Sequence, residues 1–479
     1  MAQETLNEIR KVRLQKADKL RSLGVDPYPS KLEKDPQKIE GVRKSIGKNV
    51  AVAGRLVSFR EHGNISFADL KDETASIQLL FQKKKLDKNY TVAKLLDVGD
   101  FILVWGKVVK TEAGETTVDA EGLQVLTKSI RPLPSVWHGL KDMEERYRRR
   151  YVDLLLDPAV KERFIRKSKF WDANREFMKK NGFLEVETPI LEHFTGGADA
   201  KPFKTHHDAL DEDFYLRIST ELHQKRLVVG GFEKIYTLGP NFRNEGIDNE
   251  HLQEYYQIEW YWAYANYLQA MELVRDMFIF VAKKVYGKTE FVKGNHKFDL
   301  SDNWKQIDYV DAIKKRLGVD VFKDSKESML KKLRDMKTEL PGVVNKARLV
   351  DNLWKLVRKD ITGPAFLINE PKFVSPLAKS KPDNSDLTER FHVIIAGAEL
   401  GNGYSELNDP VDQLERFQEQ QKAREAGDEE AQMLDMDYVE ALEYGMPPTV
   451  GYAHSERVFW FLENVTAREG TFFPQMKKK

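Results

Sequence analysis

Two prolines in the run Arg131-Pro132-Leu133-Pro134 divide this 479-residue chain and constrain its fold more than any other local feature. Each proline fixes its own φ angle and restricts the residue before it, so the run forms a stiff connection. Before it the sequence holds short strand-like segments, and after it comes a long amphipathic helix. The sequence therefore predicts separately folded parts, joined by a linker over residues 131–150.

The part before the linker is predicted to be a small β-barrel over residues 49–130. It contains five segments rich in β-branched and aromatic residues: VAVAGRLVSF, ISFADLKD, ASIQLLF, FILVWGKVVK and TTVDAEGLQVL. Turns that contain Gly, Asp and Lys separate these segments. Five short strands with a helix before the last pair fit an OB-fold, whose open face often binds single-stranded nucleic acid.

Residues 1–48 are predicted to be a basic, helical extension of this barrel. The first 50 residues hold 12 Lys or Arg against 7 Asp or Glu, an excess that suits either phosphate contacts or a solvated helix face. The helical pattern runs from about residue 3 to residue 23. Its expected inward positions are Leu6, Ile9, Ala17 and Leu20.

The part after the linker is predicted to be an α+β domain over residues 151–479. The run DPAVKERFIRKSKFWDANREFMKKNGF has the pattern of a long amphipathic helix that ends at Asn181-Gly182. Beyond it, strands and helices mix without regular alternation, which favours an antiparallel sheet flanked by helices over a Rossmann fold. Residues 266–360 are highly charged and mostly helical in pattern, and are predicted to form an insert.

The composition excludes several kinds of chemistry. The chain has no cysteine, so disulfides, thiolate metal sites and a cysteine nucleophile are ruled out. It contains no apolar run of about 18 residues, and its N-terminus lacks the apolar core of a signal peptide. We therefore expect a cytoplasmic protein that does not bind a membrane.

The strongest local signal for a functional site is the run FRNEG, followed by the strand-like run EYYQIEWYW. Period-two alternation puts four polar or aromatic side chains on one face of that strand: Tyr255, Gln257, Glu259 and Tyr261. Such a face is costly to bury without a ligand. Arg243 beside it suits a nucleotide, with the guanidinium for phosphate and an aromatic ring for the base. An exposed strand face with a surface arginine is the alternative.

A second candidate site is the run GAELGNGYSEL. Asn402, Tyr404 and Glu406 alternate onto one face, and the glycines between them leave room for a ligand to approach the backbone. Glu399 has the opposite parity, so a bulge must re-aim it if it joins the site. A glycine-rich edge strand without a ligand is the alternative.

Taken together, these runs resemble the class II aminoacyl-tRNA synthetases. GFLEVETPIL resembles motif 1, a dimer-interface element; FRNEG and the next strand resemble motif 2; HSER and its helix resemble motif 3. The runs STELHQKRLVVGGF and GNGYSELNDP are more similar to the lysyl enzymes than to the aspartyl or asparaginyl ones, and the similarity covers nearly the whole chain in order. The resemblance implies an OB-fold that reads the anticodon, followed by a class II catalytic domain.

The resemblance also implies a reaction and its partners. The expected activity is ATP-dependent attachment of L-lysine to tRNA(Lys) through a lysyl-adenylate, with Mg²⁺ as cofactor and a homodimer formed through the motif 1 region. At the ATP site it implies catalytic roles for Arg243 and Arg457. The other ATP contacts that it implies are Glu245, His251, Tyr255 and Glu399.

For the amino acid and the anticodon, the resemblance implies two further sets of residues. Glu221, Tyr261 and Glu406 would receive the ε-ammonium group of lysine. The remaining lysine contacts would be Gly197 and Glu259 at the α-amino group, Asn402 at the carboxylate, and Tyr404 in the same pocket. In the barrel, Phe67 and Gln78 fall where the family contacts anticodon bases.

Three departures from the family pattern affect the ATP side. His392 stands where the family has its first Mg²⁺ carboxylate, which leaves Glu399 of the usual pair. The run GYAHSER is one residue shorter than the family's glycine-rich pattern and has Glu456 in place of Asp. HLQEYY replaces HNPEF in the motif 2 loop. We expect Mg²⁺ to be held by Glu399, without a direct bond to His392.

Three other interpretations remain open on the sequence. A paralogue that transfers lysine to a protein is one, although such paralogues lack the N-terminal barrel. An aspartyl or asparaginyl enzyme is another, but Glu221 and Glu406 call for a cationic substrate side chain. The third is a nucleic-acid-binding or regulatory protein that kept the fold without catalysis, and the intact Arg243, Glu259 and Arg457 count against it.

Overall fold

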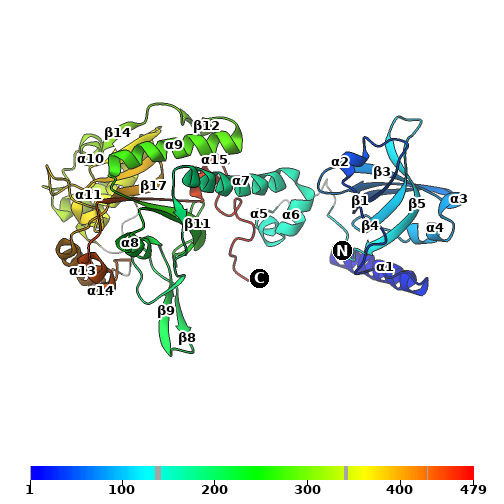
Figure 1. Cartoon of the computed structure of the whole chain (residues 1–479), viewed down its shortest axis with the longest axis horizontal. Helices are drawn as coiled ribbons and strands as arrows, with labels where there is room; N and C mark the ends of the chain where they lie inside the picture. The colour runs from blue at the N-terminus through cyan, green and yellow to red at the C-terminus, as the bar shows by residue number, and fades with distance from the viewer. Residues whose placement is uncertain (1, 135–141, 339–343, 429, 479) are drawn as a thin grey trace. The chain divides into compact units, whose positions relative to one another are not determined.

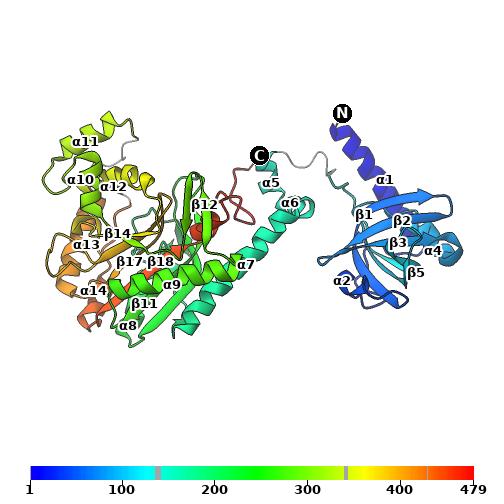
Figure 2. The same cartoon turned by 90° about the horizontal axis from the view of Figure 1, so that it is seen from above.

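A computed structural model describes residues 2–134, 142–338, 344–428 and 430–478 of the chain. The chain divides into two compact units, Met1–Lys141 and Asp142–Lys479 (Figures 1 and 2). Of the linker predicted at residues 131–150, positions 135–141 lie outside the described residues. Within the described part of the chain, every helix is too short or too polar to cross a membrane.

The first unit is a closed β-barrel, which confirms the predicted OB-fold (Figure 1). The strands follow the spatial order β1-β2-β3-β5-β4 around the barrel. Their bounds are β1 (Asn49–His62), β2 (Ile65–Lys71), β3 (Ser76–Gln82), β4 (Phe101–Lys110) and β5 (Thr116–Thr127). Three short helices accompany them: α2 (Ile39–Val42), α3 (Lys83–Leu86) and α4 (Lys88–Ala93). Alternate strand residues, such as Val52, Leu79 and Val104, fill one apolar core inside the barrel.

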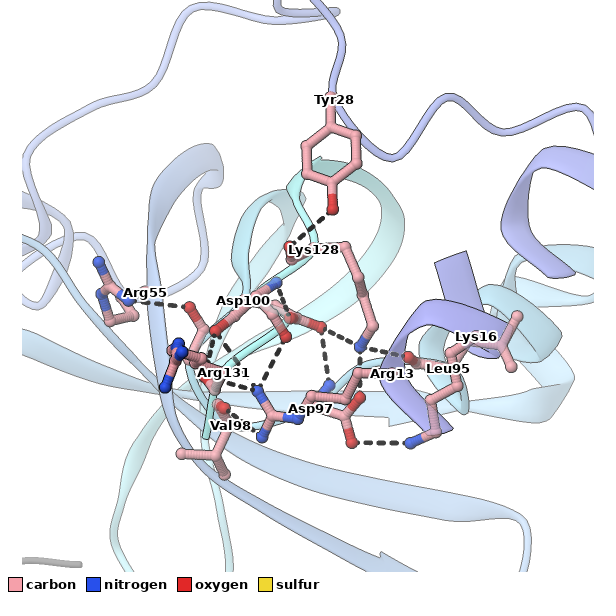
Figure 3. A network of polar contacts seen from close by, with 12 residues as sticks. Arg13, Lys16, Tyr28, Arg55, Leu95, Asp97, Val98, Asp100, Lys128 and Arg131 are labelled. Carbon is pink, nitrogen blue, oxygen red and sulfur yellow. Dashed lines mark hydrogen bonds and ion pairs between the residues drawn. The ribbon is translucent and has the colours of Figure 1, made fainter. Parts of the chain in front are cut away.

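Helix α1 (Ala2–Ser22) packs on this barrel, partly through a buried arginine. Ala17 and Leu20 are buried as predicted, but Ile9 is 36% exposed, so that prediction is wrong. Arg13 is buried in this helix, because the surface beneath it presents carbonyl groups that a guanidinium can satisfy (Figure 3). It donates to the carbonyl oxygens of Val98 at 3.0 Å, Ser129 at 2.9 Å and Arg131 at 3.2 Å.

A fully buried lysine lies at the centre of the same network (Figure 3). The Lys128 ammonium donates to the Leu95 carbonyl at 2.8 Å and to Asp100 Oδ2 at 2.7 Å, and it also contacts Asp97 Oδ2. Lys16 of α1 reaches the other oxygen of Asp97 at 2.7 Å. The two carboxylates therefore face two ammonium groups of opposite charge, whereas the Arg13 guanidinium is satisfied by backbone carbonyl groups.

The second unit is built on an eight-stranded sheet of order β14-β15-β16-β17-β18-β11-β10-β6. All neighbouring strands are antiparallel except the outermost pairs, β14 with β15 and β10 with β6. The bounds are β6 (Leu184–Glu185), β10 (Lys234–Phe242), β11 (Glu254–Ala263), β14 (Lys305–Asp308), β15 (Ala365–Ile368), β16 (Arg390–Ile395), β17 (Ala398–Ser405) and β18 (Thr449–Ser455). The predicted α+β fold with an antiparallel-rich sheet is confirmed.

Helices cover both faces of this sheet (Figures 1 and 2). On one face, α7 (Pro158–Lys180) and α9 (Tyr267–Tyr286) lie side by side in the main apolar core, with α15 (Arg457–Leu462). The other face carries α8 (Glu221–Val229), α13 (Pro410–Glu425) and α14 (Met436–Glu443) around a second apolar cluster. Ile258 and Tyr261 of β11 contribute to opposite cores, as strand alternation requires.

The remaining elements lie at the margins of the sheet. Helices α10 (Tyr309–Leu317), α11 (Lys326–Asp335) and α12 (Lys346–Val357) share an apolar cluster with Leu367 of β15 and Ile394 of β16, whereas α9 of the same predicted insert belongs to the main core. Helices α5 (Met143–Arg148) and α6 (Arg150–Leu156) precede α7. Two small sheets complete the unit: β12 (Glu290–Lys293) with β13 (His296–Asp299), and β7 (Leu191–Glu192) with β8 (Lys204–His207) and β9 (Glu212–Leu216).

Candidate active site

A cavity of about 380 Å³ lies over β11, β16, β17 and β18, and it gathers the residues that the sequence singles out in the second unit. Neighbouring antiparallel strands bring together segments that are more than a hundred residues apart in the chain, because β11 pairs with β18 and β18 pairs with β17. The predicted residues that line the cavity are Gly197, Glu221, Arg243, Glu245, His251, Tyr255, Glu259, Tyr261, His392, Glu399, Asn402, Tyr404, Glu406 and Arg457.

Strand β11 supplies the polar floor of the cavity, with the alternation that its sequence predicts. Glu259 is buried at its centre and accepts hydrogen bonds from the Tyr261 hydroxyl at 2.7 Å, the Thr220 hydroxyl at 2.9 Å and the Gln257 amide at 3.0 Å. Burial raises the pKa of the Glu259 carboxyl, and the nearby Glu221 adds to this effect. A cationic group that entered the cavity would relieve both costs.

Strand β17 carries the bulge that was needed to re-aim Glu399. Its pairing with β16 shifts between Val393 and Ile394, which leaves Leu400 unpaired, and both Glu399 and Asn402 line the cavity. Gly401 and Gly403 line the cavity as well. A Cβ atom on Gly401 would lie 2.0 Å from the Tyr452 hydroxyl, and one on Gly403 would lie 2.6 Å from the Phe391 ring, so packing of the core also requires glycine at both positions.

A pair of buried carboxylates, Glu221 and Glu406, lines the cavity. Tyr404 donates its hydroxyl to Glu221 Oε1 at 2.6 Å. Glu406 Oε1 is buried without a hydrogen-bond partner in the described structure. Both carboxylates contact the ammonium group of Lys225, a residue that the sequence analysis missed. The signal for it was a lysine one helical turn after Glu221, a spacing at which helical side chains meet.

At the other end of the cavity, aromatic and basic groups surround an open space. The Arg243 guanidinium lies over the Tyr255 ring, 5.5 Å from its centroid. Arg457 is ion-paired with Glu250 of the loop after β10, a contact that the sequence did not reveal. His251 of the same loop is held by Asp248, with Nδ1 2.8 Å from Oδ2.

His392 and Glu399 are held by different partners. His392 Nε2 lies 3.1 Å from Glu370 Oε2, and the Arg390 guanidinium reaches the same oxygen at 3.0 Å. Burial acts to raise the pKa of Glu370, but Arg390 and His392 outweigh it and lower that pKa. Glu399 Oε1 accepts the indole N–H of Trp354 at 2.5 Å. Among the described residues, no group of three or more His, Asp or Glu side chains is arranged to hold a metal ion.

The shortened run before Arg457 is part of the core. His454 is buried beside the rings of Phe170, Phe278 and Tyr452, and burial lowers its pKa to about 3, so it is neutral. Glu456 is ion-paired with Lys167 of α7. The run therefore joins β18 to the start of α15, and its residues His454 and Ser455 also line the cavity.

In the barrel, Phe67 and Gln78 lie on the outer faces of two paired strands, β2 and β3. Phe67 is half-buried and does not belong to the barrel core. Gln78 of β3 lies opposite Asp69 of β2, which is two residues after Phe67. The Gln78 Oε1 atom accepts a hydrogen bond from the Thr117 hydroxyl at 2.8 Å.

Comparisons with known proteins place this architecture in a family. Residues 142–477 match the family described as tRNA synthetases class II (D, K and N), and residues 50–126 match the OB-fold nucleic acid binding domain. A lysine–tRNA ligase of Thermoanaerobacter pseudethanolicus is 44% identical, over 99% of this chain and 97% of the relative. Those of Thermotoga sp. strain RQ2 and Carboxydothermus hydrogenoformans are 43% and 42% identical, over 99% and 100% of this chain and 97% and 100% of each relative. The chain belongs to the lysine–tRNA ligases, within the class II tRNA synthetases.

Proposed function

We propose that this chain attaches L-lysine to tRNA(Lys) in an ATP-dependent reaction, with lysyl-adenylate as intermediate. The observation that carries the proposal is the buried carboxylate pair Glu221 and Glu406 in the same cavity as Arg243 and Arg457. Lys225 balances only one charge of the buried carboxylate pair, so the pair calls for a further cationic group, and the two arginines that line the same cavity suit a polyphosphate. Lysine and ATP together meet both requirements.

The lysine substrate would span the cavity from Arg243 to the carboxylate pair. Its ε-ammonium would meet Glu406 Oε1, the buried oxygen without a partner, together with Glu221 and Tyr261. Its α-ammonium would meet Glu259. The remaining lysine contacts would be the backbone at Gly197, the Asn402 amide beside the substrate carboxylate, and Tyr404, which orients Glu221. Gly197 has a φ of +81°, and a Cβ there would lie 2.7 Å from the Glu221 Cβ, so this position requires glycine.

ATP would occupy the open end of the cavity. Tyr255 would stack on adenine, with Arg243 on the α-phosphate and Arg457 on the opposite side of the nucleotide. Arg457 must then exchange its ion pair with Glu250 for the ATP phosphates. Glu245 and His251 would complete the contacts, at the adenine edge and the outer phosphates.

The residues present fit a Mg²⁺ ion that is bound mainly through ATP. Mg²⁺ in nucleotide sites is held by one or two carboxylates together with phosphate oxygens, and Glu399 is such a carboxylate in the cavity. Although burial acts to raise the pKa of Glu399, neighbours that include His392 and Arg358 lower it, so the carboxylate is ionised. When bound, Mg²⁺ would neutralise phosphate charge.

The protein's part in the reaction is to position the reactants and to neutralise charge. A carboxylate oxygen of lysine forms a bond to the α-phosphorus of ATP as the bond to the pyrophosphate oxygen breaks. The terminal ribose hydroxyl of tRNA then attacks the adenylate carbonyl, and AMP leaves. Arg243 and Arg457 would hold the reacting groups in line and offset the charge on the phosphates. No protein nucleophile is required, in agreement with a chain that has no cysteine.

The other partners follow from surfaces outside the cavity. The outer face of the barrel, with Phe67 and Gln78, would bind the anticodon, and the chain would act in the cytoplasm, where tRNA is charged. A homodimer through the motif 1 region is supported by exposed apolar side chains there. These are Leu184 at 53%, Ile190 at 42%, Leu191 at 43% and Phe194 at 48% exposure.

The test of the whole proposal is ATP–pyrophosphate exchange with each of the twenty amino acids. Exchange should depend on lysine and be at background with aspartate and asparagine. The carboxylate pair repels the anionic side chain of aspartate, and the neutral amide of asparagine leaves the buried carboxylate charge unbalanced. Charging of tRNA with labelled lysine is the companion measurement. Absence of lysine-dependent exchange, or exchange that is faster with aspartate or asparagine, would contradict the proposal.

His392→Glu should increase the number of metal ions that bind together with ATP. A carboxylate is a good ligand for a hard cation, whereas the imidazole at this position is a poor one that is already hydrogen-bonded to Glu370. Mn²⁺ can replace Mg²⁺ in a direct count of bound ions at saturating ATP, which does not depend on activity. His392→Gln is the matched control, because it removes the imidazole without adding a carboxylate and should bind no additional ion. An unchanged count and unchanged Mg²⁺ dependence in His392→Glu would contradict this account of the metal site.

A further inference from the structure

Lys225 contacts both members of the carboxylate pair and is not one of the residues that line the cavity among those described. It belongs to α8, one turn after Glu221, and its side chain is 0% exposed. Its ammonium group is 2.5 Å from Glu221 Oε1 and also contacts Glu406 Oε2. The two carboxylates line the cavity, and the lysine holds them from the protein side.

We propose that Lys225 is a positioning residue whose ammonium group, in contact with both Glu221 and Glu406, favours the ionised form of this carboxylate pair in the empty cavity and so sets the charge that the substrate side chain meets. The inference rests on the proposed function, because it concerns the subsite that would take the lysine ε-ammonium. It differs from a purely structural role, in which Lys225 would only tie α8 to the end of β17.

The charges of the cavity support this role. Glu221, Glu406 and Glu259 are all buried and would carry three negative charges at the lysine end. The positive charge of Lys225 balances one of these negative charges, and the two ammonium groups of free lysine would balance the other two. The carboxylate of the lysine substrate would then face Arg243. Without Lys225, the empty site would hold an excess buried negative charge, which is costly enough that a carboxylate would take up a proton instead.

Several other polar and charged side chains lie near the Lys225 ammonium group. In addition to the carboxylate pair, the rings of Tyr404 and Tyr438 lie 5.5 and 5.8 Å away, and Glu259 and Tyr261 lie beyond the pair. Burial acts to lower the pKa of Lys225, but the two carboxylates reverse this effect and raise it, so the ammonium stays charged. Burial raises the pKa of the Glu406 carboxyl well above its usual range, and Lys225 is the main group that opposes this rise. Removal of Lys225 therefore favours a protonated carboxyl pair.

Lysine binding to Lys225→Met should release a proton that the wild-type protein does not release. In the variant, the substrate ammonium would displace the proton held by the carboxylate pair. Titration calorimetry in buffers of different ionisation enthalpy counts the protons exchanged, and the difference from wild type cancels any titration of lysine itself. We expect about one more proton released per lysine, so the Kd for lysine of the variant, relative to wild type, should fall about tenfold from pH 6.5 to pH 7.5.

Lys128 provides a matched control in the other unit. It too is a fully buried lysine between two carboxylates, Asp97 and Asp100 (Figure 3). Lys128→Met should lower the melting temperature without any change in the protons exchanged on lysine binding. A Lys225→Met protein that behaves like this control, with wild-type proton exchange, would overturn the proposal.

The stability of the variant gives a second test that does not need lysine to bind. A carboxyl pair whose folded pKa is raised contributes stability at low pH and loses it as the pH rises through that pKa. Lys225→Met should therefore be less stable at pH 8 than at pH 6 relative to wild type, and the double variant Lys225→Met/Glu406→Gln should lose this difference. Equal destabilisation at both pH values would overturn the proposal. If wild type bound no lysine, the proposed function would fail, while this stability test would still stand.

Discussion

Glu221→Gln and Glu406→Gln are each expected to raise the KM for lysine in pyrophosphate exchange by about 100-fold or more, with little change in the KM for ATP. Breaking a buried, hydrogen-bonded charge pair costs roughly 3 kcal/mol or more, which corresponds to that factor. Because Lys225 contacts both carboxylates, either substitution leaves one carboxylate against one ammonium. The pair would then carry no net charge for the substrate, so the two variants should be similarly impaired.

The ATP dependence separates a lysine-specific defect from a general one. Arg243 and Arg457 lie at the other end of the cavity, so ATP binding should stay within a few-fold of wild type in both variants. Glu463→Gln is a suitable control, because that carboxylate is also nearly buried, at 6% exposure, and accepts two hydrogen bonds from Arg166 outside the cavity. It should affect stability and leave the KM for lysine unchanged. A KM for lysine within about twofold of wild type in the two cavity variants would refute the assignment of the carboxylate pair.

The parts of the site that the sequence could predict are those set by local periodicity. In β11, two-residue alternation was sufficient to place Tyr255, Gln257, Glu259 and Tyr261 on the cavity face, because a strand offers only two sides. The parity of Glu399 likewise required a bulge, and β17 has one. The five strands of the barrel could also be predicted, because each has β-branched or aromatic residues and is flanked by residues typical of turns.

The parts that could not be predicted depend on contacts between distant segments. Glu370, which follows the end of β15, contacts His392 of β16, and Trp354 of α12 contacts Glu399 of β17. Period and spacing carry no information about such pairs. The helical pattern of α1 gives the spacing of buried positions, but it does not reveal that the surface beneath the helix is lined with carbonyl groups, which the buried Arg13 satisfies.

Phe67→Ala is expected to lower kcat/KM for tRNA charging about 10- to 100-fold, while lysine-dependent pyrophosphate exchange stays at the wild-type rate. An aromatic ring that stacks on a base contributes about 1–3 kcal/mol, which sets this range. Phe67 is half-buried on the outer face of β2 and lies outside the barrel core, so truncation removes ring surface without opening a cavity inside the barrel. Amino-acid activation takes place in the second unit and should not respond.

Phe101→Ala is the matched control for this prediction. Phe101 is also a half-buried phenylalanine on the outside of the barrel, but it lies on β4, where the guanidinium of Arg55 is 4.2 Å from its ring centroid. If the face formed by β2 and β3 reads the anticodon, tRNA charging should fall in Phe67→Ala and remain near wild type in Phe101→Ala. Equal losses in both variants would point to general loosening of the barrel. A wild-type rate of charging in Phe67→Ala would mean that the anticodon is read without this ring.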